Sequence, residues 1–259
     1  MKLKSLLLLV LINFNYFFSI NLIGQNKESF VNAVDIFNPS RVKNVKYKLV
    51  LYNQKENALS DIAILDRKIS RDTYNQTPII KITEEYNNNK TNTKTLCYID
   101  LKTLLPLYLE VQSSDTLIKK YNFKKDKILL VEIKNSKEIK KEFNNQTGVF
   151  LSNSFSEILQ SIDFSKNKRV QFKTFSPEKK PAVFKIKVID EKDFILPNKQ
   201  SIETWVLQFT VERSNGEVKS GGYRYIDKKS GKVLAFKTDI NSDSFFTYQM
   251  NLLEEPFDE

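Results

Sequence analysis

The chain has 259 residues, a formal net charge of +10 at pH 7 and one cysteine, Cys97. It contains no histidine, which excludes histidine-activated nucleophiles and zinc sites with histidine ligands. The basic balance does not indicate nucleic-acid binding, because the lysines are scattered and the chain has only six arginines, the usual readers of bases. We therefore expect no cofactor, no metal and no nucleic-acid partner.

The N-terminus indicates export. Two lysines precede an apolar run that extends from Leu6 to Ile23, which is the order of charges and apolar residues in a secretory signal peptide. Three asparagines interrupt the run and make it poor as a membrane span of about 20 residues. We expect residues 1–24 to be a signal peptide that is cleaved after Gly24, and the protein to be periplasmic or secreted. An uncleaved membrane anchor is the alternative.

Residues 25–250 are expected to form a single β domain, followed by an acidic C-terminal tail at 251–259. A short helix opens the domain, because Phe30, Val34 and Phe37 recur at helical spacing and Pro39 ends the run. With one cysteine the chain cannot form an internal disulfide. Cys97 is interpreted as a small buried apolar residue, with a reactive thiol as the alternative.

Alternation of apolar and polar residues predicts two runs of strands. In the clearest strand Leu105, Leu107, Leu109 and Val111 share one face. The connections are too short for parallel crossovers, so neighbouring strands are antiparallel. Strand patterns lie at 45–51, 61–69, 78–86, 94–100, 105–111, 116–123 and 127–133, and again at 169–175, 182–190, 202–212, 217–226, 232–238 and 245–250.

One helix separates the two runs of strands. Ser154 precedes Glu157 by three residues, a spacing at which each side chain can cap the other's backbone N–H. Phe155, Ile158, Leu159 and Ile162 then form one apolar stripe, which predicts a helix of about ten residues at 154–163. So short a helix is marginal in water. We expect it to pack on the apolar face of the strands.

A short phrase occurs twice. The sequence from Tyr98 to Thr103 (YIDLKT) returns as YIDKKS from Tyr225, and both copies indicate a strand, a turn and a strand. The domain therefore has two similar halves. Asp100 and Asp227 are interpreted as turn residues that accept backbone N–H bonds, with a paired-carboxylate site as the alternative. Gly231 supplies a left-handed turn position where the first copy has Leu104, so the first turn is expected to differ.

These features resemble the lipoprotein-localisation superfamily, the LolA/LolB-like half-barrels, and within it a periplasmic branch of unknown function. The resemblance covers residues 40–250. It rests on the exported, disulfide-free β chain, on the phrase that begins at Tyr98 and its echo at Tyr225–Leu234, and on the single helix at 154–163. It implies a curved antiparallel sheet, an open half-barrel of about ten to twelve strands, with the helix on its concave face and an apolar cavity for acyl chains. It carries no binding residue over to this chain.

The expected function is non-catalytic binding of a lipid, an acyl chain or an acylated protein in the cell envelope by a monomer, with an envelope protein as a further partner. The alternatives are a structural or protein-interaction component and a carboxylate-dependent hydrolase. A closed core is the other interpretation of the apolar residues, because burial stabilises a side chain equally in a core and at a pocket wall. The candidate ligand-lining residues are Leu105, Leu107, Leu109, Phe155, Leu159, Trp205, Leu207 and Phe209.

Overall fold

The computed structural model describes residues 29–55, 58–88, 91–114, 117–145, 148–176, 179–196, 199–241 and 244–255. The expected signal peptide, residues 1–24, lies outside these ranges. All described helices and strands belong to one compact unit, Val31–Glu259. In the described part of the chain no helix has the length and apolar character needed to cross a membrane.

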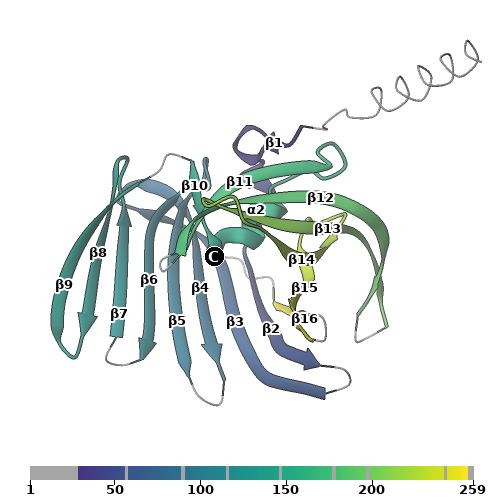
Figure 1. Cartoon of the computed structure of the whole chain (residues 1–259), viewed down its shortest axis with the longest axis horizontal. Coiled ribbons are helices and arrows are strands. Elements are labelled where there is room, and N and C mark those ends of the chain that lie inside the picture. The colour runs from purple at the N-terminus through teal and green to yellow at the C-terminus, as the bar shows by residue number, and fades with distance from the viewer. Residues whose placement is uncertain are drawn as a thin grey trace, which may run out of the picture. The chain divides into compact units, whose positions relative to one another are not determined.

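The unit is built from one sheet that curves around a short helix (Figure 1). The strands β1 (Val31–Asn32) and β10 (Val149–Leu151) pair parallel with β11 (Arg169–Ser176), and the other neighbours are antiparallel. In sheet order the strands are β1 (Val31–Asn32), β11 (Arg169–Ser176), β12 (Lys179–Ile195), β13 (Ser201–Arg213), β14 (Val218–Asp227), β15 (Val233–Asn241), β16 (Ser244–Glu255), β2 (Val45–Lys55), β3 (Ala58–Tyr74), β4 (Thr77–Asn87), β5 (Asn92–Asp100), β6 (Pro106–Ser114), β7 (Leu117–Phe123), β8 (Lys127–Lys134) and β9 (Lys137–Asn144), with β10 (Val149–Leu151) beside this path.

The expected mainly-β, open arrangement is confirmed. The two runs of strands join where β16 pairs with β2, and β9 and β1 end the sheet without pairing with each other among the described residues. The described sheet has 16 strands rather than ten to twelve. The sequence patterns missed β1 and β10, which are two and three residues long, and β9, in which all eight residues are exposed and no apolar face is buried.

The helix α2 (Phe155–Gln160) follows a 3₁₀ turn, η3 (Ser152–Ser154). Its stripe packs on the sheet as expected, because Ile158, Leu159 and Ile162 are fully buried in the main core. The helix has six residues rather than ten. The expected mutual capping is wrong: the Ser154 hydroxyl donates to the Leu151 carbonyl at 3.0 Å, and Glu157 accepts from an arginine of the sheet instead.

Two further expectations about the ends of the domain are wrong. The first segment forms two 3₁₀ turns, η1 (Ala33–Asp35) and η2 (Pro39–Arg41), and no α-helix. Asn38 Oδ1 accepts from the Ser40 backbone N–H at 3.2 Å and so caps the start of η2. At the other end β16 extends to Glu255, which pairs with Lys46, so only residues 256–259 of the expected tail lie outside the described residues.

The repeated phrase forms the same turn twice. The backbone N–H of Leu104 donates to the Asp100 carbonyl at 2.9 Å, and that of Gly231 donates to the Asp227 carbonyl at 2.8 Å. Each aspartate carboxylate also accepts from the N–H two residues later, at 2.9 and 2.8 Å. The expected difference between the turns is wrong, because Leu104 itself takes a left-handed conformation. The carboxylates serve their own turns, with β15, β16, β2, β3 and β4 between the strands that carry them.

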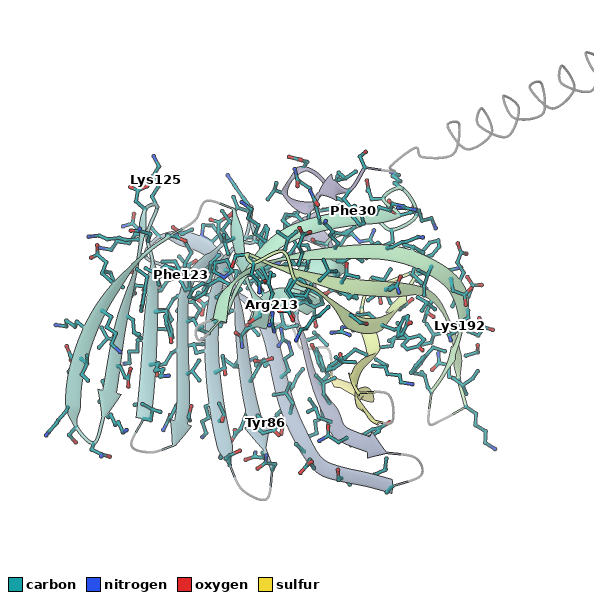
Figure 2. The ribbon with its side chains drawn as sticks, viewed as in Figure 1. Phe30, Tyr86, Phe123, Lys125, Lys192 and Arg213 are labelled. Atoms are coloured by element: carbon teal, nitrogen blue, oxygen red, sulfur yellow. The ribbon has the colours of Figure 1, made fainter. Side chains whose placement is uncertain are left out.

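The core lies between the concave face of the sheet and α2. Figure 2 shows side chains filling this space, while Lys125 extends away from the strands. The strands that face α2 contribute alternate residues to the core, as Val45, Tyr47 and Leu49 do from β2. The burial of α2 on this face places its first turn beside the open part of the half-barrel, where the candidate site lies.

Candidate functional site

A cleft of about 340 Å³ lies beside α2 on the concave face of the sheet. Strands from both halves of the domain meet there, because β2–β4 form one side and β12, β14 and β15 contribute from the other. The residues that line it are Leu49, Leu51, Leu65, Arg67, Glu84, Ser152, Asn153, Phe155, Ser156, Phe184, Arg224 and Phe236. The cleft therefore combines an apolar wall with a small number of charged groups, as ligand pockets commonly do.

The apolar wall continues directly into the core. Phe155, at the start of α2, has its ring centroid 5.0 Å from that of Phe209 and 5.3 Å from that of Phe184. Leu49 and Leu51 belong to the concave face of β2, and Leu51 is only partly buried there. The wall is thus made of side chains that the core holds in place and that still present a free side to the cleft.

A buried ion-pair network forms the polar end of the cleft. Arg67 on β3 pairs with Glu84 on β4 and donates to Glu157 on α2 at 2.6 Å and to the Asn153 carbonyl at 2.8 Å. The Arg67 and Glu157 side chains are 5% and 1% exposed. The network fixes α2 and η3 to the sheet, because breaking a buried pair leaves an uncompensated charge.

Arg224 lies at the opposite side of the cleft, on β14. Its guanidinium carbon is 4.3 Å from the Phe236 ring centroid and 4.9 Å from that of Phe209, and Nη1 donates to the Tyr223 carbonyl at 2.9 Å. A guanidinium stacked on aromatic faces forms a cation–π contact. The charged groups of the cleft are thus engaged with the protein itself, and the apolar wall is the surface that a ligand would meet.

The structure brings the eight candidate residues together only in part. Leu109, Leu159, Leu207 and Phe209 are fully buried in the core, and Leu105, Phe155 and Trp205 are partly buried against it. Leu107 falls in a β-bulge between Tyr98 and Ile99 of the neighbouring strand and is outside the core cluster. Trp205 lies beneath the ammonium group of Lys168, which is 3.5 Å from its ring centroid. Of the eight, only Phe155 lines the cleft.

Two charged residues of the site, Arg67 and Glu84, were not predicted from the sequence, although the strand patterns contain a sign of them. In β3 the concave face carries Ala63, Leu65 and Ile69, and Arg67 interrupts this stripe. In the same way Glu84 interrupts the apolar face of β4. A charged residue at an apolar position of a strand indicates a buried partner. It does not say which partner, because Glu157 is 90 residues distant from Arg67 in the chain.

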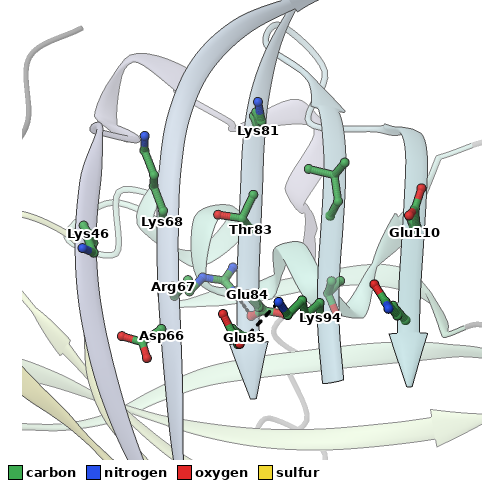
Figure 3. Close-up of a pocket in the computed structure, with 13 residues that line it drawn as sticks. Lys46, Asp66, Arg67, Lys68, Lys81, Thr83, Glu84, Glu85, Lys94 and Glu110 are labelled. Atoms are coloured by element: carbon green, nitrogen blue, oxygen red, sulfur yellow. Dashed lines mark hydrogen bonds and ion pairs between the residues drawn. The ribbon is translucent and has the colours of Figure 1, made fainter. Parts of the chain in front are cut away.

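A second depression, of about 560 Å³, lies on the opposite face of β2–β6 (Figure 3). Both lysines and acids line it: Lys94 is paired to Glu85 at 3.7 Å, and Asp66 is paired to Lys48, which lies outside the depression. These side chains are between about one third and three fifths exposed, so their pairs contribute little to stability. We interpret this face as a solvated, self-neutralised surface.

Two further observations concern the thiol of Cys97 and the residues that could bind a metal ion. Cys97 is fully buried, and burial raises the pKa of its thiol to about 12. The interpretation of Cys97 as a small apolar core residue is therefore confirmed. Among the described residues no cluster of three or more cysteines and acids could hold a metal ion.

Comparisons with known proteins identify a family and a distant structure. A family profile described as "Protein of unknown function (DUF3108)" matches residues 44–249. No curated protein matches the chain. A solved structure, a DUF1329 family protein from Desulfovibrio piger, aligns with a TM-score of 0.29 and 7% sequence identity over 83% of this chain and 85% of that chain.

Proposed function

The chain belongs to the DUF3108 family of proteins of unknown function, and we propose that it is an exported, non-catalytic protein that binds an apolar ligand in the cleft beside α2. The ligand class is a lipid, an acyl chain or an acylated protein. The observation that carries the proposal is the cleft itself, with its wall of Leu49, Leu51, Leu65, Phe184 and Phe236.

The size and chemistry of the cleft support this class of ligand. Its volume of about 340 Å³ lies at the lower end of the range of small-molecule pockets, about 300–1,000 Å³. Arg67 and Arg224 contact carboxylates, carbonyls and rings of the protein itself. Covering the leucine and phenylalanine side chains is then the main source of binding free energy, at roughly 25 cal/mol per Å² of apolar surface.

The test compares a substitution in the cleft with one on the other face of the same strand. Leu51→Trp places a larger side chain into the cleft, whereas Val50→Trp places it on the opposite face of β2, outside the cleft. Native mass spectrometry, organic extraction and titration with a fluorescent fatty acid measure bound ligand. We expect binding by the wild type and the Val50→Trp variant, and a loss of at least about tenfold in affinity for Leu51→Trp.

Two results would contradict the proposal. One is a protein that is purified without ligand and that ignores added fatty acids and lipopeptides. The other is an equal affinity in both tryptophan variants, since binding would then occur elsewhere. Circular dichroism of both variants checks that the fold is retained. N-terminal sequencing of the protein from the producing cell tests export, with Gln25 as the expected first residue.

A further inference from the structure

The strand β9 forms one edge of the sheet. It pairs with β8, and it is the last strand in the sheet order of the described residues. All eight residues are exposed, including Ile139 at 48% and Phe143 at 44%. A free strand edge presents unpaired N–H and C=O groups that can pair with another chain.

The turn before β9 determines which backbone groups point outward. Asn135 and Ser136 have φ values of 50° and 62°, the conformation of a two-residue type I′ turn, and Lys134 opposite Lys137 closes the hairpin. Hydrogen-bonded and non-hydrogen-bonded pairs then alternate along the ladder. The odd-numbered residues of β9 bond to β8, and the even-numbered residues, from Glu138 to Asn144, direct their N–H and C=O groups to the free edge.

We propose that β9 pairs antiparallel with β9 of a second copy of this chain, in the register that places Lys140 opposite Glu142 of the second copy. A two-fold pairing must join even-numbered residues to even-numbered residues, because only these have outward backbone groups. The proposed register does so. It also places Ile139 opposite Phe143 of the second copy, twice, and Lys141 opposite its own equivalent.

The neighbouring registers are less favourable. A shift that places Lys140 opposite its own equivalent sets Glu138 against Glu142, and a shift that places Glu142 opposite its own equivalent also joins like charges. A fourth register places Glu138 opposite Lys140 of the second copy. In it the two β9 strands overlap over fewer residues, and Lys137 lies opposite Lys141. Like charges directly opposite each other on paired strands are destabilising, and opposite charges and apolar pairs are stabilising. Among these registers the pattern KEIKKEFN thus favours the proposed one, which pairs the strand from Glu138 to Asn144.

The proposed register has one like-charge contact, between Lys141 and Lys141 of the second copy. In each copy the carboxylate of Glu132 on β8 partly neutralises this lysine, because Lys141 Nζ lies 3.8 Å from Glu132 Oε2. Lysines on an edge strand normally oppose pairing with other chains. Here the same lysines restrict pairing to the register in which the acids oppose them and in which Ile139 and Phe143 become covered. The proposal replaces the monomer expected from the sequence with a dimer joined at β9.

Disulfide cross-linking tests the register. Lys141 opposite its own equivalent is a non-hydrogen-bonded pair, with Cα atoms about 4.5 Å apart, which a disulfide can join. The variant Lys141→Cys, in the full-length chain, should form a covalent dimer under mild oxidation at least about tenfold faster than Lys137→Cys. Lys137 is exposed on the same face of the same strand, but in the proposed register it does not lie opposite Lys137 of the second copy. The native Cys97 is buried and does not compete. Equal rates in the two variants would overturn the register.

Charge reversal tests the dimer independently. Lys140→Glu and Glu142→Lys should each raise the dimer dissociation constant at least about tenfold in analytical ultracentrifugation, because each turns two attractive pairs into repulsive ones. The double variant restores opposite charges and should return close to the wild-type constant. The local pairs that are lost, Lys140–Glu138 and Lys127–Glu142, are exposed, so the fold is retained. A wild type that stays monomeric at all concentrations, or single variants that dimerise like the wild type, would refute the proposal.

Discussion

Leu104 and Gly231 occupy the same position in the two copies of one turn, with φ values of +57° and +75°. Their surroundings differ. The Leu104 side chain is fully buried, whereas a Cβ atom at Gly231 would lie 2.8 Å from the carbonyl oxygen of Gln160 at the end of α2. In the first turn Leu104 thus has a strained left-handed backbone, and its buried side chain contributes to the core. The second turn needs glycine because the helix end lies against it.

The first prediction concerns Gly231. Gly231→Ala should destabilise the protein by more than Gly216→Ala does, as measured by urea unfolding. Both positions have left-handed backbones, which cost a non-glycine residue about 1–2 kcal/mol. Only at Gly231 would the new methyl group also meet a backbone atom, since nothing lies within 4 Å of a Cβ at Gly216. Equal losses in the two variants would show that the turn does not press on α2.

The second prediction concerns the buried ion-pair network. Arg67→Met should destabilise the fold by about 3–5 kcal/mol in urea unfolding at neutral pH, because it leaves the carboxylates of Glu84 and Glu157 without their shared arginine. The methionine replaces the stem of the arginine, so most of the loss arises from charge rather than from volume.

A double-mutant cycle separates the loss caused by unpaired charge from the loss caused by the change in side-chain volume. The variant that combines Arg67→Met with Glu157→Gln should recover part of the loss, because the unpaired charge on α2 is removed. Lys94→Met is the matched surface control, since its pair with Glu85 is exposed and should cost less than about 1 kcal/mol. A loss from Arg67→Met as small as that from Lys94→Met would contradict the role assigned to the network.

The third prediction concerns the turn aspartates. Asp100 accepts from the backbone N–H groups of Lys102 and Thr103 at 2.9 and 2.8 Å, and Asp227 accepts from the N–H of Lys229 at 2.8 Å. Asp100→Ala and Asp227→Ala should each cost on the order of 1 kcal/mol in urea unfolding. Both should leave ligand binding unchanged. A loss of binding without a loss of stability would favour a paired-carboxylate function.

The fourth prediction concerns Cys97. Burial raises the pKa of its thiol to about 12, well above the ordinary value of about 8.5. The folded protein should resist iodoacetamide at pH 8 and react readily in denaturant. Between about pH 8.5 and 12 the unfolded state loses the thiol proton while the folded state keeps it, so the free energy of unfolding falls as pH rises through this window. A Cys97→Ala variant should show a smaller alkaline loss, and rapid labelling of the folded wild type would contradict the burial.

The sequence by itself determined the class of fold and the local structures. Alternating apolar residues, as in Val45, Tyr47 and Leu49, specify strands and their buried face, because side chains alternate across a sheet. The stripe Ile158, Leu159 and Ile162 specified a helix that had to be buried. The repeated turn could also be predicted from the sequence, since an aspartate carboxylate accepts hydrogen bonds from N–H groups two or three residues away. All of these depend on contacts between residues close in the chain.

Only the tertiary structure decided the site. The pairing of β16 with β2 joins the two halves, and it brings Leu51 and Phe236, which are far apart in the chain, to the lining of one cleft. The bulge at Leu107 removes that residue from the core face, which strict alternation could not indicate. Arg67 and Glu157 meet across 90 residues of chain. A local pattern can mark one residue of such a contact, as the interrupted stripe marks Arg67, but it does not identify the partner, because the partner depends on how the whole sheet curves around α2.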